Sequence, residues 1–164
     1  MNIFYLHPEP ALAAQYHCDA HCGKMLIEYA QLLSTAHRLS DSDQSEQCYK
    51  AAYKNHPSTV WTRDSAANYR WLYSLWSALA EEFHKRRGKH HASWLKLRDV
   101  LANVPEALPS TQFQEPPQCM PDEYKRPGDS VSAYRDYYLQ DKSRFARWDW
   151  PNSQTPDWWT PSAN

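Results

Sequence analysis

The chain has 164 residues, with 18 basic and 19 acidic side chains and a formal net charge of −1. A chain of this length can bury the core of one domain. Its near-neutral balance excludes binding to nucleic acid through bulk charge, so any such surface must come from local clusters of cations. Only three glycines are present, which argues against glycine-rich phosphate loops and therefore against P-loop and Rossmann folds.

We expect neither a secretory signal nor a membrane segment in the first residues. "MNIFYL" is too short for the apolar part of a signal peptide, and proline and glutamate follow it closely. No window is apolar enough to span a membrane. We therefore expect a cytoplasmic protein with no membrane partner, in which the cysteines are reduced. All four fit small core side chains better than a zinc signature; they are Cys18, Cys22, Cys48 and Cys119.

The first half of the chain is predicted to be helical after a short start. Residues 2–6 form either a short strand or an extended arm, which the prolines of "HPEP" end. One long helix is expected from about Glu9 to Arg38, because its apolar residues repeat at helical spacing. The polar stretch "LSDSDQSEQ" ends this helix, and a shorter helical piece is expected at residues 46–54.

A second long helix is predicted over residues 57–87. Pro57 and Ser58 suit a helix start, and Gly88, after the basic run "HKRR", suits the C-terminal cap. A further helix is expected at 92–103.

The last third of the chain begins with a proline-rich connection, residues 104–128, which must lie over the surface. Asp129 or Ser130 then caps a helix that runs to about Trp148. The prediction is an all-α, compact single-domain bundle of about four to five helices, residues 1–150. An irregular aromatic tail follows at 151–164, with Trp158 and Trp159 either docked on the body or exposed for a partner.

One polar row stands out on the first predicted helix. At 100° per residue, its positions trace a single stripe between apolar residues, as in the wall of a cleft. Three interpretations are open. The row is a solvated face with a Lys24–Glu28 pair, or a metal site of His17 and His21 with a distant third ligand such as His56, or a site of acid–base or amine chemistry. The row consists of His17, His21, Lys24, Glu28, Gln31 and Thr35.

Four motifs follow one another along the chain. They are "PALAAQYH" at the start of the first long helix, "KNHPSTVW" before the second, "EEFHKRRGK" at its end, and "VSAYRDYYLQDKSRFARWDW" on the late helix. Their order resembles that of the phage pyrimidine-dimer DNA glycosylases, small all-α enzymes that cut DNA at ultraviolet lesions. The resemblance extends over most of the chain and implies the fold of that family. It also suggests a monomeric phage-encoded protein that acts in the bacterial host cell.

The resemblance also implies a mechanism. In that family the free N-terminal amine attacks C1′ of the damaged, flipped nucleotide, a glutamate of the first helix supports the chemistry, and the resulting imine permits strand cleavage by β-elimination. α-Amines have pKa values of about 7.7–8.0, so a large fraction is unprotonated and nucleophilic at neutral pH. No cofactor is implied, and the expected partner is duplex DNA with a flipped base, or a nucleotide.

The chain departs from the family pattern at two positions. Residue 2 is Asn2, a poor context for methionine removal, so the amine is expected on Met1. The position of the family's glutamate falls near Lys24, and Glu28 lies one helical turn further on. Either Glu28 takes over this role, or the chemistry differs and Lys24 itself supplies the amine. The expected catalytic residues are Met1, His17, His21, Lys24 and Glu28, with no metal ligands.

Contacts with nucleic acid are expected at three basic stretches, 83–91, 123–128 and 142–147, each of which includes or adjoins an aromatic residue. Cations for phosphates and rings for an unstacked base form the expected combination, although cations also end helices favourably. Arg135 matches the family arginine that holds the target strand, and Asn55 and His56 precede a helix start that suits a phosphate. The candidates are Asn2, Asn55, His56, Arg63, Lys125, Arg126, Arg135, Lys142, Arg147 and Trp148.

Three functions are therefore compatible with the sequence. The first is a DNA-base-processing enzyme that resembles a pyrimidine-dimer DNA glycosylase and acts through an amine and a carboxylate. The second is a phage enzyme that transfers a group to a modified pyrimidine in DNA or a nucleotide on the same fold. The third is a non-catalytic DNA- or protein-binding module.

Overall fold

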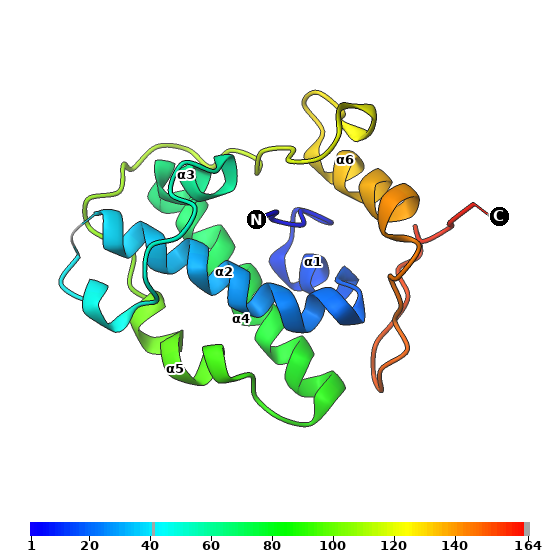
Figure 1. Ribbon diagram of the computed structural model, residues 1–164, viewed down its shortest axis with the longest axis horizontal. Coiled ribbons are helices and arrows are strands. Elements are labelled where there is room, and N and C mark those ends of the chain that lie inside the picture. The colour runs from blue at the N-terminus through cyan, green and yellow to red at the C-terminus, as the bar shows by residue number, and fades with distance from the viewer. Residues whose placement is uncertain (41, 163–164) are drawn as a thin grey trace.

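All regular elements are helical in the computed structural model, which describes residues 1–40 and 42–162 (Figure 1). The predicted all-α class is confirmed, with more α-helices than expected because two predicted helices are broken. The α-helices are α1 (Pro10–Tyr16), α2 (Asp19–Leu39), α3 (Pro57–Asp64), α4 (Ala66–Arg87), α5 (Ala92–Leu101) and α6 (Ser130–Tyr137). Two 3-10 turns, Ser45–Gln47 and Asp122–Tyr124, and a π-helical turn, Tyr138–Lys142, complete the elements.

The predicted single helix from Glu9 to Arg38 is wrong, because the chain becomes extended at His17 and Cys18. A buried guanidinium stabilises this break. Arg86 of α4 donates hydrogen bonds to the carbonyls of Gln15 and His17, each at 2.9 Å, and to a carboxylate oxygen of Asp19 at 3.2 Å. The carbonyls at the end of α1 therefore have a partner without continuing the helix.

The predicted helix over residues 57–87 is also broken, at Ser65. The Ser65 backbone is extended, and its hydroxyl accepts the backbone N–H of Asn68 at 3.0 Å, as the N-cap of α4. The side chain of Asn68 in turn donates to the carbonyl of Trp61 near the end of α3, at 2.9 Å. The sequence pattern shows a continuous apolar face, and a serine within it gives little warning of a break.

The core lies where α2 crosses α4, and α5 packs beside α2 (Figure 1). The indole N–H of Trp76 on α4 donates to the carbonyl of Leu26 on α2 at 2.9 Å, which ties the two helices together. Both residues are fully buried. Among the described residues, no helix is both long enough and apolar enough to cross a membrane.

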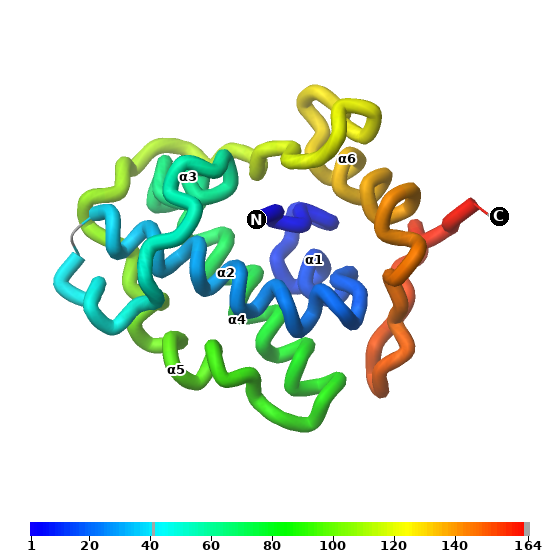
Figure 2. Tube along the Cα trace, in the orientation of Figure 1, coloured from blue at the N-terminus to red at the C-terminus, as the bar shows by residue number. Residues whose placement is uncertain are grey.

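Residues 1–8 form an extended N-terminal arm that pairs with no strand in the described part of the chain, so the arm alternative for residues 2–6 is confirmed. In Figure 2 the arm lies between α3 and α6. Residues 3–6 are buried. The helix predicted at 46–54 is wrong: only residues 45–47 form a turn, and the backbone N–H groups of Tyr49 and Ala52 donate to hydroxyls of α2. Residue 41, in the predicted polar break, lies outside the described residues.

The late helix is shorter than predicted, since α6 ends at Tyr137 and its π-helical continuation at Lys142. The residues that follow fold back as an irregular tail. Trp158 packs edge-on against Tyr16, and Trp159 lies 4.8 Å from Trp148 between ring centroids. The aromatic tail is therefore docked on the body; residues 163 and 164 lie outside the described residues.

Candidate active site

The N-terminal arm brings the α-amine of Met1 to within 4.0 Å of Oε1 of Glu28, in the middle of α2. The Met1 side chain is almost buried, and the Glu28 side chain is one-fifth exposed. The other carboxylate oxygen of Glu28, Oε2, accepts no hydrogen bond from the described residues. An amine and a partly desolvated carboxylate thus face each other at the surface of the core.

Lys24 completes this arrangement from one helical turn earlier. Its ammonium lies 3.8 Å from Oε2 of Glu28, at the i, i+4 spacing that places two side chains on one helix face. The Lys24 side chain is 70% exposed, so it is free to meet a phosphate from solvent. Of the predicted polar row, Lys24 and Glu28 are the pair that the fold places beside the amine.

His56 belongs to the surroundings of the amine, although it follows Glu28 by 28 residues. It forms the N-cap of α3, where its Nδ1 accepts the backbone N–H of Ser58 at 3.1 Å. Its pKa is lowered by partial burial and by the positive charge of the Met1 amine. Asn55, beside it, is exposed. The positive charge of the Met1 amine therefore acts on the turn before α3.

His17 does not belong to the same helix face, which corrects the predicted row. It caps the end of α1 and is fully buried. Its Nδ1 lies 2.6 Å from the carbonyl of Ala13, and its Nε2 lies 2.8 Å from the hydroxyl of Tyr29. Burial lowers the pKa of His17 to about 4, so the ring is neutral at neutral pH.

His21 is likewise a core side chain. Its ring stacks on Phe4 of the arm at 4.3 Å, and its Nδ1 lies 2.6 Å from the hydroxyl of Tyr138. Burial, with smaller contributions from nearby cations, lowers its pKa to about 2. Because both nitrogens of His17 and one of His21 already have protein partners, the metal alternative gains no support. No cluster of three or more metal-ligating side chains occurs in residues 1–40 and 42–162.

The remaining residues of the row have structural contacts. Thr35 is buried, and its hydroxyl accepts the backbone N–H of Ala52 at 3.1 Å. Gln31 is partly exposed on the same helix. The prediction of one cleft wall along the whole row is therefore wrong. The helix break separates His17 from the face of α2, and His21 is buried in the core.

The predicted nucleic-acid contacts occupy varied environments. Several cations are paired with neighbouring acids: Lys125 with Asp122 at 2.9 Å, Arg126 with Asp136 at 2.6 Å, and Lys142 with Asp141 at 3.1 Å. In the basic stretch 83–91, Arg86 lies in the core. Only cations that remain open to solvent, or that exchange their partner for a phosphate, can contribute to binding.

Other candidates contact the protein itself. Nε of Arg135 donates to the carbonyl of Leu6 at 2.9 Å, so this group of Arg135 holds the arm. Arg147 is exposed and donates to carbonyls of its own loop, whereas Trp148 is buried. Arg63 on α3 has one buried guanidinium nitrogen without a partner among the described residues, and Asn2 is partly exposed next to the amine.

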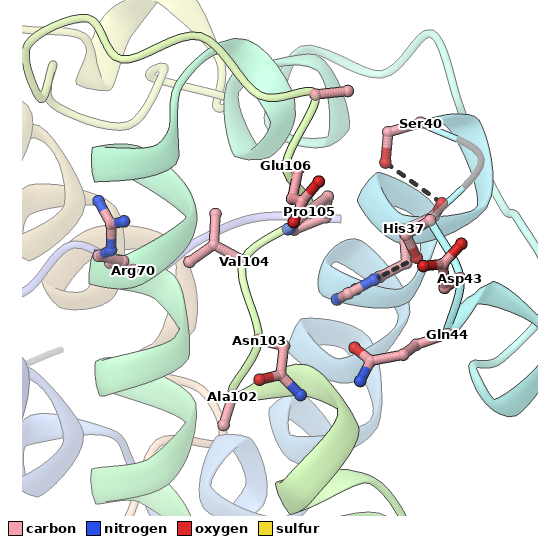
Figure 3. A pocket seen from close by; sticks show the side chains of 12 residues that line it. His37, Ser40, Asp43, Gln44, Arg70, Ala102, Asn103, Val104, Pro105 and Glu106 are labelled. Carbon is pink, nitrogen blue, oxygen red and sulfur yellow. Dashed lines mark hydrogen bonds between the residues drawn. The ribbon is translucent and has the colours of Figure 1, made fainter.

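Two surface cavities lie apart from the amine. The first, of about 930 Å³, opens between the C-terminal ends of α2 and α5 and faces Arg70 of α4 (Figure 3). Within it, Nδ1 of the buried His37 lies 2.7 Å from the hydroxyl of Ser42. The second, of about 910 Å³, is lined by Arg147, Trp148 and tail residues. Neither cavity is lined by Met1, Lys24 or Glu28.

A family model of the pyrimidine dimer DNA glycosylases matches residues 1–96, more than half of the chain. The chain belongs to the pyrimidine dimer DNA glycosylase family. The matched region contains the arm, Lys24, Glu28 and His56. No curated protein and no solved structure matched the chain. Family membership makes this protein a glycosylase-type enzyme of DNA repair, with DNA as its class of substrate.

Sequence reasoning missed two residues that build the site. Tyr29 accepts the backbone N–H of Phe4 in the arm, and Arg86 stabilises the break before α2. Tyr29 has the spacing of an ordinary core residue, and Arg86 lies within a basic run that predicts solvent exposure. The only signal for Tyr29 is its position next to Glu28.

Proposed function

We propose that this glycosylase uses the α-amine of Met1 as its nucleophile and Glu28 as the carboxylate that supports it. The observation that carries the proposal is the 4.0 Å approach of the amine to Glu28 in the matched region. At 4.0 Å the ion pair is longer than a hydrogen bond, so proton transfer from the ammonium to Glu28 requires a bridging water or a closer approach in the complex with DNA. The same carboxylate stabilises positive charge that develops on the sugar. Glu28 thereby takes the role of the family's glutamate.

The reaction is a displacement followed by an elimination. The amine nitrogen bonds to C1′ of the damaged nucleotide as the glycosidic bond breaks, and the departing pyrimidine takes the bonding electron pair. Loss of a proton from nitrogen and opening of the sugar ring give an imine. A base, which we propose is Glu28, then removes a proton from C2′, and the 3′ phosphate leaves by β-elimination.

Substrate binding is proposed to use the open cations around this pair. The exposed ammonium of Lys24 contacts a phosphate next to the target nucleotide, which is flipped out of the duplex so that C1′ can reach the amine. Asn2, Asn55 and His56 are the further candidates for contacts with this nucleotide.

The group-transfer alternative rests on two departures from the family pattern, Lys24 near the position of the family's glutamate and Asn2, which disfavours removal of Met1. A Met1 amine 4.0 Å from Glu28 supports the glycosylase reaction despite both departures, so no second enzymatic function is proposed.

The test is base release and strand cleavage on a duplex with one thymine dimer. We expect Glu28→Gln to lower the single-turnover rate by about 100-fold or more, because loss of a catalytic acid–base group costs about 10²–10⁴-fold. Glu46→Gln is the matched control, since Glu46 is exposed and pairs with Arg38; it should retain the wild-type rate. Tight duplex binding by the wild type without any product would contradict the proposal and favour a non-catalytic module.

A further inference from the structure

Side chains of the helices hold the N-terminal arm in place, and no strand among the described residues pairs with it. Besides a local turn from Leu6 to Phe4, three backbone groups of the arm bond to the helices. The N–H of Phe4 donates to the Tyr29 hydroxyl at 3.1 Å, the carbonyl of Leu6 accepts from Arg135, and that of Pro8 accepts from Trp71. Of these bonds, the one to Tyr29 lies nearest to the amine in sequence.

The direction of each hydrogen bond around Tyr29 is fixed by its neighbours. The carbonyl of Ala13 can only accept, so Nδ1 of His17 carries the proton and donates to it. Nε2 of the neutral ring then accepts the hydroxyl proton of Tyr29. The Tyr29 oxygen therefore presents its lone pairs to the N–H of Phe4, and all three bonds are satisfied in this one arrangement.

Tyr29 and Glu28 are consecutive residues of α2. Neighbours in an α-helix differ by a fixed rise of 1.5 Å and a fixed rotation, so the point that holds Phe4 and the carboxylate that meets Met1 are rigidly related. Only Asn2 and Ile3 separate the two contacts along the arm, and Ile3 is fully buried. A shift of the Phe4 amide is thus passed on to the amine.

We propose that Tyr29 is a positioning residue of the active site, whose hydroxyl fixes the Phe4 amide and thereby holds the Met1 amine at Glu28. This inference rests on the proposed function. A purely structural role, in which Tyr29 only fills the core and stabilises the fold, is the competing account.

The chain contains a matched control for this role. Tyr69 on α4 is also fully buried, its hydroxyl donates to the carbonyl of Leu101 at 2.7 Å, and it lies 2.9 Å from Nε2 of His37. Within the described part of the chain, the Tyr69 hydroxyl forms no hydrogen bond to the arm. Tyr29→Phe and Tyr69→Phe therefore remove the same atom from comparable tyrosine–histidine pairs, and only the first change touches the arm.

The experiment measures borohydride trapping on a duplex with an abasic site, under single-turnover conditions at saturating enzyme. We expect Tyr29→Phe to slow trapping by about 10- to 100-fold, since a misplacement of about 1 Å costs on the order of 10²-fold. Its dissociation constant for the same duplex should stay within about twofold of wild type. Tyr69→Phe should trap at the wild-type rate. Equal slowing in both variants, or a Tyr29→Phe rate within about twofold of wild type, would overturn the inference.

A second measurement needs no substrate and separates this inference from the proposed function. Amide hydrogen exchange should be at least about tenfold faster at residues 2–6 in Tyr29→Phe and unchanged there in Tyr69→Phe, as local opening predicts. Unchanged exchange in Tyr29→Phe would overturn the inference even if trapping fell. Wild-type protein that forms no adduct on Met1 would instead overturn the proposed function, and with it the catalytic purpose of the arm.

Discussion

At the scale of single residues, burial decides which polar side chains are available for chemistry. Glu28 keeps one carboxylate oxygen without a hydrogen bond and faces the Met1 amine. His17 and His21, from the same stretch of sequence, are enclosed and neutral. Through tyrosine hydroxyls, His17 connects the end of α1 with α2, and His21 connects α2 with the π-helical turn that follows α6.

These histidines predict a pH dependence of stability. The pKa values of His17 and His21 are lowered to about 4 and about 2, mainly by burial, against an ordinary value of about 6.5 in the unfolded chain. Below about pH 6.5 the unfolded state binds protons that the native state does not. The stability that they contribute is therefore complete above pH 6.5 and is lost as the pH falls toward 4.

The free energy of unfolding should fall by about 1.4 kcal/mol per pH unit for each histidine in this window. Urea unfolding at several pH values between 7 and 4 measures the slope. His21→Phe should make it shallower, whereas His90→Gln, at an exposed site, should leave it unchanged. Equal wild-type stability at pH 7 and pH 5 would contradict this reading of the two rings.

At the scale of elements, one buried cation determines how the chain enters α2. Arg86 bonds to the last carbonyls of α1 and to Asp19, and Glu82 lies 3.4 Å away. The other carboxylate oxygen of Asp19 accepts the N–H groups of Asp149 and Trp150, at 2.6 and 2.9 Å. This cluster therefore joins α1, α2, α4 and the tail.

Arg86→Met should accordingly destabilise the fold by about 3–5 kcal/mol, because it leaves a buried carboxylate and two carbonyls without their donor. Arg87→Met removes a neighbouring, exposed guanidinium, which lies 4.5 Å from the Trp150 ring centroid, and should cost about 1 kcal/mol or less. Chemical denaturation of both variants measures the difference. Similar losses in the two would show that the cluster does not stabilise the junction.

At the scale of the whole molecule, the candidate site combines distant parts of the sequence. The amine comes from residue 1, the carboxylate from α2, and the neighbouring imidazole from the turn before α3. Spacing predicted the all-α class and most of the helical segments. It also placed Lys24 and Glu28 on one helix face, because that depends on helix geometry alone.

Spacing could not predict the two helix breaks or the fate of the histidines. The break at His17 depends on a guanidinium from α4, about 70 residues away in sequence. The burial of His21 depends on Phe4 and Tyr138, from opposite ends of the chain. The proximity of Met1 to Glu28 likewise needs the tertiary path of the arm, which Tyr29 and Arg135 hold. The resemblance suggested the amine of Met1 and left open whether Glu28 supports it or Lys24 replaces it, and the fold brings the Met1 amine to 4.0 Å from Glu28.

In the proposed reaction, the α-amine of Met1 performs the chemistry beside Glu28. The most direct test of this claim is reduction with borohydride during reaction with a thymine-dimer duplex, and in parallel with an abasic-site duplex, followed by peptide mass mapping of the adduct. We predict a covalent adduct on Met1 with both substrates. An adduct that maps to Lys24, or the absence of any adduct and of strand cleavage, would contradict the claim.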